Sequence, residues 1–101
     1  MESPLLPPTP VFDLLDAFVQ LRTREDAESF LVDLCTPAEL EALSGRWRVA
    51  RLVREGIPYR EIHDRTGVST ATITRVARAL TQGTGGYRRM LDLPAKPKRS
   101  K

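Results

Sequence analysis

The sequence predicts an all-α fold. Apolar residues recur at the three- and four-residue spacing of helix faces along most of the 101 residues, whereas no segment alternates with the two-residue period of a strand. Ser or Thr precedes several of these periodic segments, as the N-cap of a helix does. A content of 41% apolar and 29% charged residues is typical of a globular protein, and the length indicates one domain.

The structured domain is expected over residues 9–93. Residues 1–8 are rich in proline and are expected to be disordered, and residues 94–101 form a basic tail that is expected to be flexible. Thr9 and Pro10 have the order of an N-cap and a first helical residue. The helix that follows, VFDLLDAFVQL, is apolar on more sides than a solvent-facing helix of a small monomer should be. A second copy of the chain is therefore expected to cover it.

Two further helices are predicted before residue 56. Thr23 begins the first of them, and its apolar stripe consists of Ala27, Phe30, Leu31 and Leu34. Thr36 and Glu39 have the spacing of a capping box, with Pro37 at the first helical position, so the second begins there. We expect the Ser-Gly pair at 44–45 to loosen or recap this helix before its apolar pattern resumes.

Residues 58–82 predict a helix-turn-helix. A short helix over roughly 58–65 ends at Gly67, where the turn needs the positive φ that glycine adopts without steric cost. Ser69 caps a second helix, and the spacing of the apolar residues closes a small core between the two helices. That predicted core consists of Ile62, Val68, Ile73 and Val76. The residues left outside on the second helix are Ser69, Thr70, Ala71, Thr72, Thr74, Arg75 and Arg78.

The outward side chains of this second helix indicate DNA binding. β-branched threonines disfavour a helix, so packing must supply the stability that propensity withholds. Small hydroxyl and methyl groups allow a helix to approach base edges in the major groove, and arginines bind phosphates or guanine edges. His63, on the first helix, stands where such motifs carry a small residue facing the turn, and we expect it to tilt toward the nucleic acid. A metal site needs three or four ligands, and no second histidine completes one.

Charge is divided unevenly along the chain. Residues 1–44 contain two arginines and nine acidic residues, a net charge of −7, whereas residues 45–101 contain fourteen basic and four acidic residues, a net charge of +10. This asymmetry favours a polyanionic partner for the second half. The alternative is a dimer in which the acidic half of one copy faces the basic half of the other.

The remaining features indicate a cytoplasmic protein. The single cysteine, Cys35, cannot form an internal disulfide and favours a reducing compartment. No apolar run has the length of a membrane span, and the N-terminal residues have neither the basic start nor the apolar stretch of a secretory signal. After a glycine-rich link at 83–86, we expect a last short helix over 87–93, with Met90 and either Leu91 or Leu93 packing back.

Three classes of function remain open on these residues: a DNA-binding homodimer that regulates transcription, a helical module that binds another protein, and an enzyme. A protein-binding face would present large apolar or aromatic anchors, which the second helix does not offer. No nucleophile-base pair, paired carboxylates or metal cluster is readable, and the glycine-rich link precedes no P-loop lysine. The sequence therefore predicts a DNA-binding protein, not an enzyme, and no cofactor.

The segments TPAELEALSGRWRVARLVREG, REI and TGVSTATITRVARAL together resemble the Trp repressor family, and most closely its YerC/YecD-type branch. The resemblance covers roughly residues 10–92. It implies an all-helical, intertwined homodimer whose two recognition helices project to successive major grooves, about 34 Å apart along the duplex. A regulator of this kind, with repression as its expected action, works on double-stranded DNA in the bacterial nucleoid.

The resemblance also implies roles for individual residues. Thr70, Ala71 and Thr74 match family positions that read bases. Arg60 matches a family position that contacts DNA from the first helix of the motif. The two arginines between which the Trp repressor holds its tryptophan corepressor are matched by Arg46 and Arg75. The family's glycine that admits the ligand is Val76 here, which fills the space of the indole. The serine that holds the ligand's amino group is Ala79. Tryptophan is therefore not expected as a corepressor, and the two arginines can instead neutralise phosphates or acids of a partner subunit.

Overall fold

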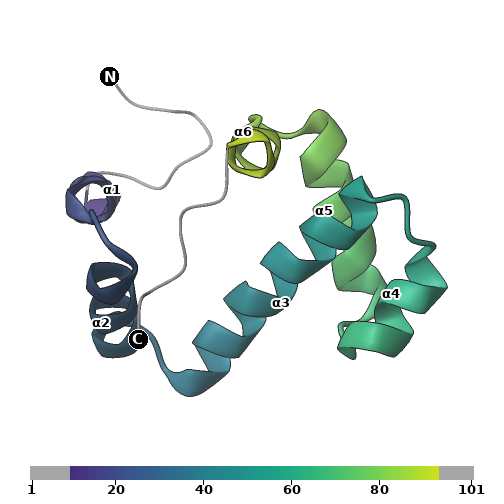
Figure 1. Ribbon diagram of the computed structural model, residues 1–101, viewed down its shortest axis with the longest axis horizontal. Helices are drawn as coiled ribbons and strands as arrows, with labels where there is room; N and C mark the ends of the chain where they lie inside the picture. The colour runs from purple at the N-terminus through teal and green to yellow at the C-terminus, as the bar shows by residue number, and fades with distance from the viewer. Residues whose placement is uncertain (1–9, 94–101) are drawn as a thin grey trace. The chain divides into compact units, whose positions relative to one another are not determined.

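The computed structural model describes residues 10–93, which form six α-helices and no strand (Figure 1). In chain order these are α1 (Pro10–Gln20), α2 (Arg24–Leu34), α3 (Pro37–Arg54), α4 (Tyr59–Thr66), α5 (Thr70–Gln82) and α6 (Gly86–Asp92). The all-α prediction is confirmed. The predicted disorder of 1–8, the cap at Thr9 and the mobility of 94–101 concern residues outside those described. No helix within 10–93 is long and apolar enough to cross a membrane.

The chain divides into two units, one ending at Cys35 and one beginning at Thr36. The first contains α1 and α2. Thr23 caps α2 as predicted, because its hydroxyl accepts a hydrogen bond from the Asp26 N–H at 3.0 Å. Phe18 of α1 and Phe30 of α2 meet edge to face, with ring centroids 5.5 Å apart. No described residue of these two helices is fully buried in the single chain.

The second unit is built on α3, whose start is fixed as predicted. The Thr36 N–H donates to Glu39 Oε1 at 2.8 Å and the Glu39 N–H donates to Thr36 Oγ1 at 3.1 Å, which completes the capping box. The expected interruption at 44–45 was wrong, since α3 runs unbroken for 18 residues. One interior glycine costs a helix only about 1 kcal/mol relative to alanine. At Gly45 an added Cβ would lie 3.2 Å from a methyl of Val68, so the glycine lets the later turn approach α3 closely.

The core lies where α3, α4 and α5 pack together. Its buried residues are Val49, Ala50, Leu52, Ile62, Ile73, Val76, Ala77 and Leu80. Ile62 and Ile73 have no exposed surface, and Val76 is 3% exposed, so these three predicted core positions are confirmed. Val68 is only half-buried and packs at the margin of the cluster. The helix-turn-helix is therefore held by its contact with α3 and not by its own small core alone.

The turn between α4 and α5 has the predicted geometry. Gly67 has a φ of 73°, and its N–H donates to the His63 carbonyl at 2.8 Å. The Thr66 hydroxyl donates to the Ile62 carbonyl at 2.7 Å and accepts from the Val68 N–H at 3.0 Å. Because one hydroxyl bonds both the end of α4 and the start of the turn, the angle between the two helices is defined by local contacts.

The last helix, α6, joins α5 and α3. Gly85 precedes it with a φ of 93°. The Arg88 guanidinium donates to the Leu80 carbonyl of α5 at 3.2 Å, and Arg54 of α3 forms an ion pair with Asp92 at 2.5 Å. The helix itself was predicted. Of its expected apolar contacts, Leu91 packs on the core, whereas Met90 and Leu93 remain exposed.

Candidate nucleic-acid interface

One side of α5 is free of the rest of the chain. Its buried positions, Ile73, Val76, Ala77 and Leu80, hold it on the core, and the opposite side is exposed. That exposed side, which we call the α5 face, consists of Thr70, Ala71, Thr74, Arg75 and Arg78. It carries no side chain larger than threonine apart from the two arginines. A helix with this profile can approach base edges closely and still place positive charge beside phosphates.

The hydroxyls predicted to contact DNA fall into two groups. Thr70 and Thr74 form no side-chain hydrogen bond within the described residues, so both hydroxyls are available to a partner. Ser69 and Thr72 instead cap α5: the Thr72 N–H donates to Ser69 Oγ at 3.1 Å, and the Ser69 hydroxyl donates to Thr72 Oγ1 at 3.1 Å. The prediction that Thr72 points outward was wrong. It is half-buried and lines two cavities on the α3 side.

His63 has a structural contact that the sequence did not indicate. Its ring nitrogen Nδ1 lies 2.8 Å from the Val68 carbonyl oxygen, so the ring donates a hydrogen bond across the turn. The residue is exposed, as expected, but its side chain is tied to the turn and does not point freely into solvent. The histidine therefore braces the link between α4 and α5 in place of the small residue usual there.

Three arginines around the α5 face are unpaired. Arg60, Arg75 and Arg78 are exposed and form neither an ion pair nor a side-chain hydrogen bond within the part of the chain that the structure describes. By contrast, Arg65 pairs with Glu61 on the same helix, and Arg54 is paired through α6. Guanidinium groups without an internal partner lose no existing contact when they bind a phosphate or a guanine edge.

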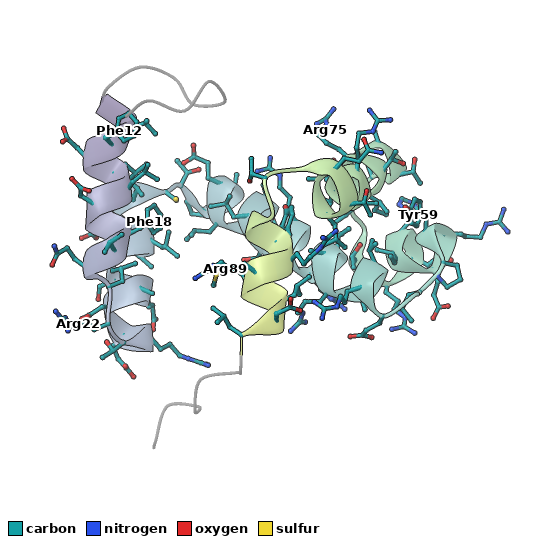
Figure 2. The ribbon with its side chains drawn as sticks, turned by 90° about the horizontal axis from the view of Figure 1, so that it is seen from above. Phe12, Phe18, Arg22, Tyr59, Arg75 and Arg89 are labelled. Atoms are coloured by element: carbon teal, nitrogen blue, oxygen red, sulfur yellow. The ribbon has the colours of Figure 1, made fainter. Side chains whose placement is uncertain are left out.

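Tyr59 extends this surface, and sequence reasoning missed it. It is the first residue of α4 and is 45% exposed. It borders a groove of about 260 Å³ between α4 and α5, whose other lining residues are Val53, Thr74, Ala77, Arg78, Thr81 and Gln82. Figure 2 shows Tyr59 on α4 and Arg75 on α5. Since Thr74 and Arg78 belong to the α5 face, Tyr59 lies at its edge.

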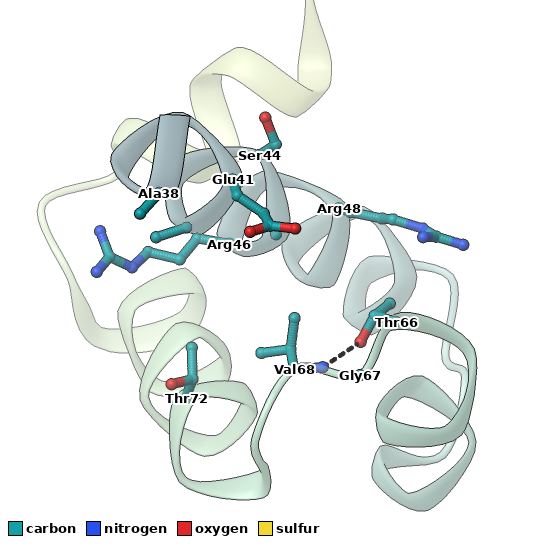
Figure 3. A pocket seen from close by; sticks show the side chains of 11 residues that line it. Ala38, Glu41, Ser44, Arg46, Arg48, Thr66, Gly67, Val68 and Thr72 are labelled. Carbon is teal, nitrogen blue, oxygen red and sulfur yellow. Dashed lines mark hydrogen bonds between the residues drawn. The ribbon is translucent and has the colours of Figure 1, made fainter. Parts of the chain in front are cut away.

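A second cavity, of about 550 Å³, lies between the first half of α3 and the turn (Figure 3). In that view Glu41 lies between Arg46 and Arg48, and the hydrogen bond from the Val68 N–H to Thr66 lies on the opposite wall. The lining of this cavity thus includes one carboxylate as well as two guanidinium groups, whereas the α5 face carries two arginines and no acidic residue. This cavity is therefore distinct in charge from the α5 face.

The two arginines that match the ligand-holding pair do come together. A cavity of about 260 Å³ between α3 and α5 is lined by Arg46, Thr72, Arg75, Val76, Ala79 and Tyr87. A neighbouring cavity of about 450 Å³ is lined by Trp47, Ala79, Gly83, Thr84, Gly86, Tyr87 and Met90. Trp47 and Tyr87 stack with ring centroids 6.4 Å apart and planes 18° from parallel. Tyr87 thus lines the same cavity as Arg46 and Arg75.

Comparison with known proteins agrees with this geometry. The family model described as Trp repressor protein matches residues 11–93. The chain belongs to the Trp repressor family. The uncharacterised protein YerC of Bacillus subtilis (strain 168) is 43% identical over 79 residues, which cover 78% of this chain and 76% of YerC.

Two solved structures share the fold of this Trp repressor family member. The crystal structure of a candidate Trp repressor from Staphylococcus aureus superposes with a TM-score of 0.77 at 41% identity, covering 82% of this chain and 83% of that one. A TrpR-like protein from Eubacterium eligens ATCC 27750 gives the same TM-score and identity, covering 82% and 86%. The resemblance inferred from the sequence fragments is therefore confirmed, and so is the all-α, Trp-repressor-like fold of the single chain.

Proposed function

We propose that this protein is a sequence-specific DNA-binding regulator of transcription, with repression as its action. It acts as a homodimer, in the cytoplasm at the nucleoid, and is not an enzyme. The observation that carries the proposal is the α5 face, where unbonded Thr70 and Thr74 stand beside unpaired Arg75 and Arg78 on a helix whose other side is buried. Short hydroxyl side chains can contact base edges or thymine methyls, and the arginines bind guanine edges or phosphates.

Each candidate residue has a role in this proposal. Thr70, Ala71 and Thr74 read bases, and Arg60, Arg75 and Arg78 contact phosphates or guanines. Ser69 and His63 contact DNA from positions that their own hydrogen bonds fix. Thr72 is the weakest member of the set because it is half-buried on the α3 side. Arg46 stands with Arg75 beside the cavity that Tyr87 borders, and no tryptophan corepressor is needed there.

The homodimer is supported by the first unit of the chain. Exposed apolar side chains gather on α1 and α2: Leu15, Phe18, Val19, Val32 and Leu34. Two helices without a buried residue are not stable alone in water, because packing of an apolar face supplies most helical stability. A second copy would cover this surface and give the dimer two α5 helices, one for each half of a two-fold site.

Selection of bound sequences from random duplexes, run with gel filtration of the free protein, tests this proposal. We expect a two-fold symmetric consensus whose half-sites lie about one helical turn apart, together with a dimeric elution volume. A protein-binding module, the alternative function, would select no consensus. A monomeric protein with no preference among duplexes at moderate ionic strength contradicts the proposal.

Alanine variants of Thr74 and Arg60 distinguish base reading from backbone contact. Each should weaken binding to the selected duplex by about 1–3 kcal/mol if its side chain reads a base, with little change on random DNA. Binding isotherms on both duplexes measure the difference. Arg65→Ala is the matched control, because that arginine lies on the same helix as Arg60 but is already paired with Glu61. Equal losses on selected and random DNA would assign Thr74 and Arg60 to backbone contacts.

A further inference from the structure

The ring of Tyr87 separates two cavities. The 260 Å³ cavity that contains Arg46 and Arg75 and the 450 Å³ cavity that contains Trp47 and Met90 have only Tyr87 and Ala79 in common. Ala79 is on α5 and has a one-carbon side chain, so it leaves room beside that helix. Tyr87 comes from α6 and fills part of the room. Tyr87 is therefore the larger of the two side chains that line both cavities.

The ring is held from the α3 side. It stacks on Trp47, which is part of α3, with the centroids 6.4 Å apart and the planes 18° from parallel. Tyr87 is half-buried and also packs against the buried core cluster. Val76, which is 3% exposed, closes the cavity from α5. The aromatic ring therefore lies between Trp47 of α3 and the apolar side chains of Val76 and Ala79 of α5.

The short helix α6 keeps Tyr87 in this position through contacts with both neighbouring helices. Arg88 donates to the Leu80 carbonyl of α5, and Asp92 pairs with Arg54 of α3. Two polar contacts thus tie α6, and with it the backbone of Tyr87, to α5 and to α3.

We propose that Tyr87 is a positioning residue for the α5 face: its side chain sets how α5 sits against α3. This inference rests on the proposed DNA-binding function. Arg75 both lines the cavity beside Tyr87 and belongs to the α5 face, and Thr74 precedes it, so a change in the cavity moves the reading residues directly. DNA binding by this protein then needs no small-molecule effector, because the occupant of the cleft is part of the chain.

Tyr87→Ala tests the inference by opening the cleft. We expect its affinity for the selected duplex to fall by about 5–100-fold, the usual range for coupling between sites, while affinity for random DNA stays within about twofold. Tyr87→Phe should bind like the wild type, because the hydroxyl forms no hydrogen bond within the described residues. Should Tyr87→Ala fail to fold, Tyr87→Leu, which keeps apolar volume but not the planar ring, is expected to lose selectivity in the same direction.

Leu91→Ala is the matched control, because Leu91 lies on the same helix and packs on the same core but lines neither cavity. It should lower stability without lowering the ratio of selected to random binding. Adding 4-methylphenol to Tyr87→Ala should restore that ratio by refilling the space of the ring. Tryptophan and 4-methylphenol should leave the wild type unchanged.

Equal loss of selectivity in Tyr87→Ala and Leu91→Ala would overturn the positioning role and leave only a structural one. A wild type that binds its selected duplex only when tryptophan is added would overturn it too. Unchanged selectivity in Tyr87→Ala contradicts this inference alone. A wild type with no duplex preference contradicts the proposed function, and the inference with it.

Discussion

Replacing Ile73 with alanine should lower the free energy of unfolding by about 2–5 kcal/mol, the usual cost of truncating a buried large aliphatic residue. Ile73 has no exposed surface and lies in the cluster formed by α3, α4 and α5. A domain of this size has a total stability of only about 5–15 kcal/mol, so the variant should be partly unfolded under mild denaturing conditions. Urea unfolding measures the loss as a lower midpoint at an unchanged slope, with both proteins at the same concentration.

Thr74→Ala is the matched control for Ile73→Ala, since the two positions are adjacent on α5 but Ile73 is buried and Thr74 is exposed. Thr74 is exposed and forms no side-chain hydrogen bond within residues 10–93, so its stability should change by no more than about 0.5 kcal/mol. The two variants thereby distinguish a residue that packs α5 on the core from a residue that α5 exposes to a partner. An unchanged midpoint for Ile73→Ala would contradict the packing of α5 on α3.

Features that depend on a few neighbouring residues were predictable from the sequence. The caps at Thr23, Thr36 and Ser69 were each identified, because the side chain bonds a backbone N–H only two or three residues away. Gly67 was identified because only its own φ matters. Ile62 was assigned to the core from spacing, since one face of a short amphipathic helix must be buried.

Features that depend on a partner distant in the sequence were not predictable. In the sequence, Gly45 suggests a helix break. In the structure, its lack of a side chain allows Val68, 23 positions later, to lie close to α3. Thr72 fits the outward hydroxyl pattern, but the tilt of α5 against α3 turns it inward. Tyr87 carries no local sign of its stack on Trp47. In each case the deciding neighbour is known only once three helices have been packed together.

A second large effect is expected from Val19→Asp on α1. Val19 is 81% exposed in the single chain, so a carboxylate there should cost the isolated protomer almost nothing. If a second copy covers α1, the same carboxylate is buried without a partner, which a protein interface tolerates poorly. We expect gel filtration to show a dimer for the wild type and a monomer for Val19→Asp. Loss of the second half-site contact should then lower affinity for the two-fold duplex by about 10²–10⁴-fold.

Gln20→Asp is the matched control for this charge, because it adds a carboxylate to the same last turn of α1, at the next, also exposed, polar position. Both variants place an acid near the negative end of the helix, so any small cost from the helix dipole is common to the two. Leu15→Asp, one turn earlier on the apolar side and 38% exposed, should behave like Val19→Asp. If Val19→Asp and Leu15→Asp both remain dimeric, the contact between copies lies elsewhere, and the exposed apolar side of α1 requires another partner.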